Sequence, residues 1–217
     1  MFVKNLVILA ASAKFNNFCV AGVDVDSGSW IRPISEKPEL EDAVPIDDLK
    51  YPDGSRVELL DVVEIKFSDR AAKNPIQPEN FFYNEKYFWQ KVGRVTLQEV
   101  IDERGFDHRD KIFYNNGRSI LGVDVIKFDE RESLLLLPVK NLFISIEETD
   151  HKKFFADFDY RDRKFFRFSV GDIAVRNKFA GSGAGKYFFR DNATVVFSLT
   201  NPYRKNAECY KMLAQIF

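Results

Sequence analysis

The hydrophobic positions of this chain recur mostly with the two-residue period of β-strands. Short apolar or alternating runs, bounded by Gly, Pro, Asn and Asp, predict strands. These runs cover residues 3–11, 18–25, 30–34, 57–67, 133–146, 154–160, 164–170, 172–175, 187–190, 193–200 and 209–217. One helix is predicted over residues 96–104, because Thr96 and Glu99 have the spacing of a capping box and Gly105 follows. Many short strands with one helix predict an all-β fold with minor α content, built as two small barrels.

The predicted helix separates two β-rich halves. We expect a first barrel over residues 1–95, and a second barrel with the connecting helix over residues 96–217. The chain has 217 residues, of which 45% are hydrophobic and 22 are Phe, and this length can bury a core in each half. No apolar run reaches the ~20 residues that span a bilayer, and no cleavage pattern follows the apolar start. We therefore expect a cytoplasmic protein that does not enter a membrane.

The net charge of -1 conceals a strong asymmetry. Residues 151–217 contain 13 Lys and Arg against 6 Asp and Glu, a net charge of +7, which leaves -8 for residues 1–150. Charge segregated in this way favours either a polyanion bound by the basic half or attraction between the halves. Both interpretations stay open from charge alone.

The motifs of common enzymes and metal sites are incomplete in this sequence. The glycine-rich segment 181–186 has Ala180 and Tyr187 where a P-loop needs Gly and Ser or Thr, and it precedes a strand. We interpret it as a flexible loop whose Lys186 is a candidate phosphate contact. The two histidines and two cysteines have no metal-ligand spacing. We expect no metal, no cofactor and no catalytic residues; enzymatic activity stays open, with a non-enzyme favoured.

Residues 152–168 combine aromatic and basic side chains at strand spacing. In a hairpin, alternate residues share one face. Proteins that bind single strands use aromatic platforms for bases and cations for the backbone. The alternative is that the Phe residues fill the barrel core while the charges face water. The candidate contacts in this segment are Lys152, Lys153, Phe155, Tyr160, Arg161, Arg163 and Arg167.

Two segments of the first half carry further candidates. Trp30 and Arg32 place a large ring near a planar cation, which suits stacking on a base or a structural cation–π pair. We interpret Trp30 as structural and Arg32 as the better ligand contact. In the segment 77–80, Asn80 could read a base edge and Glu79 could accept a proton, or both could stabilise a turn.

Six segments, in order along nearly the whole chain, resemble the prokaryotic dual OB-containing domain family. They are LVILAASAK at 6–14, CVAG at 19–22, WIRPIS at 30–35, LDVVEI at 60–65, QPEN at 77–80 and CYKMLA at 209–214. The resemblance implies two OB-like β-barrels, nucleic-acid or nucleotide binding, a link to prokaryotic conflict and defence, and no transferable catalytic set. The chain departs from the family pattern at residues 17–18, where Gly and Arg are usual, and around residues 171–173, where Thr-Asp-Pro is usual.

The leading hypothesis is a non-enzymatic protein that binds nucleic acid, with single-stranded DNA or RNA favoured. Bases would stack on Trp30, Phe155 or Tyr160, while Arg32, Lys186 and the cations of the segment 152–168 would hold phosphates.

Three alternatives from other classes stay open. The first is a recognition module for a small nucleotide or modified base, lined by Trp30, Arg32, Glu79 and Asn80. The second is a metal-dependent enzyme that acts on nucleic acid through Glu79. The third is an adaptor for a protein partner, because OB-like barrels also serve that role.

Overall fold

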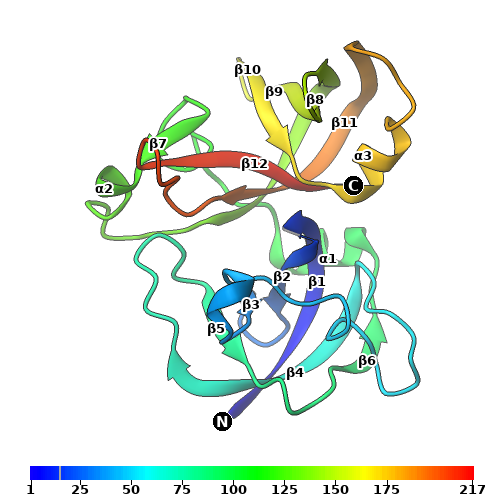
Figure 1. The fold of residues 1–217 in the computed structure, drawn as a ribbon, viewed down its shortest axis with the longest axis vertical. Coiled ribbons are helices and arrows are strands. Elements are labelled where there is room, and N and C mark those ends of the chain that lie inside the picture. The colour runs from blue at the N-terminus through cyan, green and yellow to red at the C-terminus, as the bar shows by residue number, and fades with distance from the viewer. Residues whose placement is uncertain (15) are drawn as a thin grey trace. The chain divides into compact units, whose positions relative to one another are not determined.

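The computed structural model describes residues 1–14 and 16–217, except for the side chain of Ala71. Strands make up about half of the chain and helices about a tenth, which confirms the all-β fold with minor α content. The chain divides into two compact units (Figure 1). Unit 1 comprises Met1–Asn74 and Pro78–Gly105, and unit 2 comprises Pro75–Gln77 and Phe106–Phe217.

Unit 1 is a closed barrel. Its elements are β1 (Phe2–Lys14), β2 (Asn17–Asp24), β3 (Trp30–Ile34), η1 (Pro38–Leu40), β4 (Asp61–Ala71), β5 (Asn80–Tyr83), β6 (Gln90–Arg94) and α1 (Leu97–Arg104). The sheet order is β1-β2-β3-β5-β4, and β4 also pairs with β1, which closes the ring. Strands β3 and β5 are parallel, while the other neighbours in the ring are antiparallel.

Unit 2 repeats this topology, although no repeat is visible in the sequence. Its elements are β7 (Ser119–Leu121), α2 (Gly122–Val125), β8 (Leu134–Glu148), β9 (Lys152–Tyr160), β10 (Arg163–Val170), α3 (Ile173–Lys178), β11 (Gly185–Leu199) and β12 (Glu208–Ile216). The ring order is β8-β9-β10-β12-β11, closed by β11 on β8, and β10 and β12 are the parallel pair. The prediction of two OB-like barrels is confirmed.

Each barrel has its own hydrophobic core. In unit 1 the core includes Leu6, Ile8, Val20, Ile31, Val63, Ile65, Phe67, Tyr83 and Trp89. In unit 2 the core is dominated by aromatic rings. Phe158 lies among three other rings: its ring centroid is 5.3 to 5.5 Å from those of Phe165, Phe168 and Phe197. The Phe-rich composition therefore serves, in large part, to fill a small barrel.

The predicted helix forms as α1. Thr96 Oγ1 accepts a hydrogen bond from Glu99 N, and a Glu99 carboxylate oxygen accepts one from Thr96 N at 2.6 Å, which is the predicted capping box. The structure groups α1 with unit 1, whereas the expected boundary after residue 95 grouped it with the second barrel. No helix of the described residues is long and apolar enough to cross a membrane.

The prediction of a strand over residues 172–175 is wrong, because these residues form the start of the helix α3. The side chain of Asp172 accepts a hydrogen bond from Val175 N at 3.0 Å and so acts as the N-cap of α3. The same carboxylate accepts hydrogen bonds from Gln215 Nε2 at 2.6 Å and Ile216 N at 2.8 Å, although Asp172 is only 1% exposed. A capping side chain with partners on a distant strand overrides the short apolar run.

We predict that Gly22→Ala destabilises unit 1. Gly22 lies on β2, and a Cβ there would be 2.4 Å from the carbonyl oxygen of Val7 on β1, so the two strands would have to separate. The expected loss in the free energy of unfolding is about 1–3 kcal/mol, measured by urea denaturation. The control is Gly181→Ala, where a Cβ would meet no atom within 4 Å. Equal stability of the two variants would contradict the close approach.

Candidate functional site

The structure brings Arg32, Glu79 and Asn80 together inside unit 1. The Arg32 N–H donates to the Glu79 carbonyl at 2.8 Å, and Arg32 Nη1 donates to Asn80 Oδ1 at 2.8 Å. Arg32 is 4% exposed and Asn80 is 2% exposed. Burial lowers the pKa of the Arg32 guanidinium, and the nearby Glu79 carboxylate opposes this shift. A cation buried among these partners joins the parallel strands β3 and β5, so we interpret Arg32 as structural rather than as a surface contact for phosphate.

The cation that lies over the Trp30 ring is Arg104, not Arg32, its near neighbour in the sequence. The guanidinium of Arg104, in α1, lies over the Trp30 ring at 5.1 Å from its centroid. Arg104 Nε also donates to the Gly28 carbonyl at 2.9 Å, which joins α1 to the turn before β3. These contacts agree with the structural interpretation of Trp30.

In unit 2 the pleat of β9 divides the candidate residues between the two faces of the barrel wall. Phe154, Phe158 and Tyr160 lie in the core, while Lys153 and Phe155 point outward. Tyr160 is 6% exposed, and its hydroxyl donates to the Arg109 carbonyl at 2.6 Å. Tyr160 therefore presents no open ring face for a base.

The outer side of strands β11, β8, β9 and β10 carries exposed rings. Phe188 on β11 lies opposite Phe143 on β8, and their rings form an edge-to-face pair with centroids 5.4 Å apart. Phe155 lies on β9, and Phe166 lies on β10 where the register shifts. Phe188 is 54% exposed and Phe166 is 57% exposed. We call Phe143, Phe155, Phe166 and Phe188 the aromatic face.

Two cations lie directly over rings of the aromatic face. The Arg167 guanidinium is 4.5 Å from the Phe155 centroid and forms an ion pair with Glu147. Lys186 Nζ is 4.9 Å from the Phe143 centroid and 2.6 Å from Asp157 Oδ2.

The position of Arg167 follows from a bulge in β10. Its φ of 60° is left-handed, and its N–H donates to Asp157 Oδ1 at 2.9 Å. Hydrogen bonding between the side chains raises the pKa of Arg167 and lowers the pKa of Glu147. Both groups are therefore charged at neutral pH.

The remaining predicted cations lie elsewhere in unit 2. Lys152 Nζ donates to the carbonyls of Ala180 and Ser182 at 2.7 and 2.8 Å, and so holds the glycine-rich loop. Arg161, in the turn between β9 and β10, pairs with Asp110 at 2.8 Å, and the exposed Arg163 is the first residue of β10. Of the predicted contacts, Lys153, Phe155, Arg167 and Lys186 come together on the outer face.

Sequence reasoning missed three of the four rings of the aromatic face. Phe143, Phe166 and Phe188 come from three strands, and the register that joins β8 to β11 is not local. A signal was present in β11, where Lys186, Phe188 and Arg190 alternate with more buried rings. Among the described residues, no group of three or more His, Cys, Asp and Glu side chains is placed to hold a metal ion.

A family model, the Dual OB-containing domain, matches residues 4–216. The chain belongs to this family. No curated protein and no solved structure matches the chain. OB barrels bind their ligands on the face of their second and third strands. In the second barrel of this dual OB chain these strands are β9 and β10, which carry Phe155, Phe166 and Arg167.

We predict that Arg32→Ala reduces stability. The variant would leave Asn80 Oδ1 buried without its charged donor, at a cost of about 2–3 kcal/mol measured by urea denaturation. Arg163→Ala is the control, because Arg163 is exposed and should change the free energy of unfolding by less than about 0.5 kcal/mol. An Arg32→Ala variant as stable as the control would contradict the structural interpretation of Arg32.

Proposed function

We propose that the protein binds single-stranded nucleic acid on the aromatic face of its second barrel. The observation that carries the proposal is a group of four outward Phe side chains on neighbouring strands of this barrel. Phe155 and Phe166 lie on β9 and β10, the strands that OB barrels use for binding, and Phe143 and Phe188 lie on the adjoining β8 and β11. Rings grouped on an exposed surface leave apolar area in contact with water. A base stacked on such a ring covers this area. A duplex hides its base faces, so an unpaired strand fits this surface better.

The charges around the aromatic face suit a polyanion. The outward or exposed cations on these strands include Lys153, Lys164, Arg167, Lys186 and Arg190. Two of the acidic side chains on these strands, Glu147 and Asp157, pair with Arg167 and Lys186. The other acidic side chains on these strands are Glu148, Asp159 and Asp191. Residues 151–217 have a net charge of +7, which supports attraction of a phosphate backbone.

The first barrel gives less support to a ligand site. Arg32 and Asn80 are buried against each other, and Trp30 lies beneath Arg104. A nucleotide module or a metal-dependent enzyme built on these residues is therefore the weaker hypothesis. The link to prokaryotic conflict and defence that the resemblance implies stays a prediction.

We predict that a fluorescently labelled single strand of about 15 nucleotides binds at low salt, with an affinity that falls steeply as salt is added. Phe188→Ala should weaken binding about fivefold or more, since one stacked base contributes about 1–3 kcal/mol. The matched control is Phe88→Ala in unit 1, because Phe88 is 63% exposed and should leave the affinity unchanged. No binding by the intact protein, or equal loss in both variants, would contradict the proposal.

A second variant should bind more tightly than the natural chain. Glu147 occupies the guanidinium of Arg167, so it competes with a phosphate for the same cation. Glu147→Gln keeps the side-chain size but removes the charge, and anisotropy titration should show a several-fold gain in affinity. Glu39→Gln in unit 1 is the control, because η1 is remote in the chain from these strands and should show no gain. Weaker binding by Glu147→Gln would mean that Glu147 instead positions Arg167 for the ligand.

A further inference from the structure

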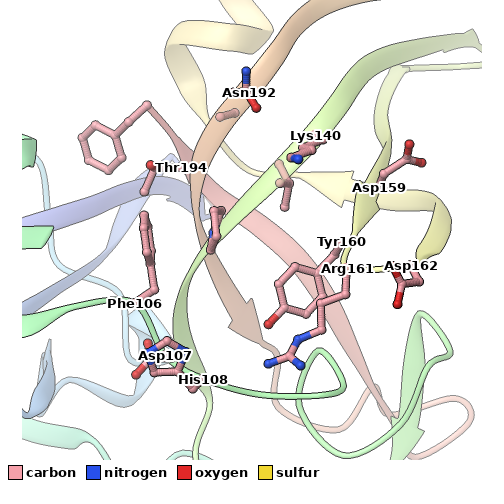
Figure 2. A pocket seen from close by; sticks show the side chains of 14 residues that line it. Phe106, Asp107, His108, Lys140, Asp159, Tyr160, Arg161, Asp162, Asn192 and Thr194 are labelled. Atoms are coloured by element: carbon pink, nitrogen blue, oxygen red, sulfur yellow. The ribbon is translucent and has the colours of Figure 1, made fainter.

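A pocket of about 590 Å³ opens within unit 2, at one end of the strands that carry the aromatic face (Figure 2). Its lining includes Lys140 of β8, Asp159 of β9, and Asn192 and Thr194 of β11. Phe106 adds aromatic surface, and the largely buried Tyr160 also lines the pocket. In Figure 2, Phe106 and Thr194 lie on one side of the pocket, and Lys140 and Asp159 lie on the other.

The walls of this pocket are held in place by hydrogen bonds. The Asp107 N–H donates to the Leu136 carbonyl at 2.9 Å, and the Asp107 carboxylate accepts from Leu136 N at 2.7 Å. Tyr160 donates its hydroxyl to the Arg109 carbonyl at 2.6 Å. The segment 106–109 is thus fixed to β8 and β9, so the pocket exists before any ligand arrives.

Several polar groups of the pocket are available to a ligand. Within residues 1–14 and 16–217, the side chains of Lys140, Asn192 and Thr194 make no hydrogen bond. Asn192 offers both a donor and an acceptor, which is the pattern that reads the edge of a base. Lys140 offers a cation for a phosphate, and the partly exposed ring of Phe106 offers flat apolar surface. Together these groups match one nucleotide: a flat ring with a polar edge and an anion.

The pocket and the aromatic face are built on the same strands, β8, β9 and β11. Lys140 pairs in register with Asp159 on β9 and with Asn192 on β11. Phe143 is three residues further along β8, a distance of about 10 Å at strand spacing. A strand that crosses the aromatic face can therefore place a neighbouring nucleotide at the pocket.

We infer that this pocket receives one unpaired base of the strand bound on the aromatic face, and that Asn192 selects which base enters. The inference rests on the proposed function, and it adds base preference to a surface whose stacking alone tolerates any sequence. The nucleotide binds by non-covalent contacts only: the edge of its base contacts Asn192, and its phosphate lies near Lys140.

The test compares labelled oligo(dA), oligo(dC) and oligo(dT) of about 15 nucleotides with the intact protein and three variants. The natural chain should prefer one of them by about fivefold or more, as expected for a read base edge. Asn192→Ala should reduce that preference to within about twofold, and Thr194→Trp, which fills the pocket, should do the same. Asn192 is exposed, so its replacement leaves the core intact. Phe188→Ala is the matched control and should weaken all three strands equally.

The outcomes separate the two proposals. If the natural chain binds none of the strands, the proposed function fails. If it binds all three equally, or if both pocket variants keep the preference, the pocket inference is overturned and the proposed function stands. Calorimetry with dAMP, dCMP and dTMP provides a further arm. Binding of a free mononucleotide that Thr194→Trp abolishes, without any change in strand affinity, would overturn the placement of a strand base in the pocket.

Discussion

One parallel strand pair, β3 with β5 in unit 1 and β10 with β12 in unit 2, is the constraint on which each barrel depends. In unit 2 this pair joins Ser169 to Met212 and Val170 to Leu213. Without it, β10 and the part of β12 beyond its pairing with β7 would be open edges, exposed to unintended pairing. Asp172 reinforces the closure, because one buried carboxylate caps α3 directly after β10 and also accepts hydrogen bonds from Gln215 and Ile216 of β12. Closure in turn fixes which side of every strand faces inward.

A closed five-strand ring has a small interior, and in unit 2 that interior is filled by aromatic rings around Phe158. The outward Phe residues therefore cannot be excess core; they lie on the other side of the pleat. Cations that cover two of these rings are held by Glu147 and Asp157. Arg167 and Glu147 are both about half exposed, and such pairs contribute little to stability. The arrangement leaves the cation available to a stronger anionic partner.

The local features of the sequence were predictable, and the non-local ones were not. The capping box of α1 and the alternation of residues in β9 follow from short-range geometry, so the pattern alone identifies them. The burial of Arg32 depends on Asn80, a residue 48 positions away, and Pro33 indicates only an extended backbone. Likewise, no local signal places Phe188 beside Phe143, because their contact depends on the register between β11 and β8. Tertiary pairing, rather than propensity, decides which candidate residues share a surface.

The central claim is that a single strand lies across the aromatic face of the second barrel. Photo-crosslinking tests it most directly: a strand with 5-iodouracil at successive positions is irradiated with the intact protein, and the linked residues are identified by mass spectrometry. The account predicts crosslinks at Phe143, Phe155, Phe166 or Phe188. Crosslinks confined to unit 1, for example around Trp30 and Asn80, would contradict the account.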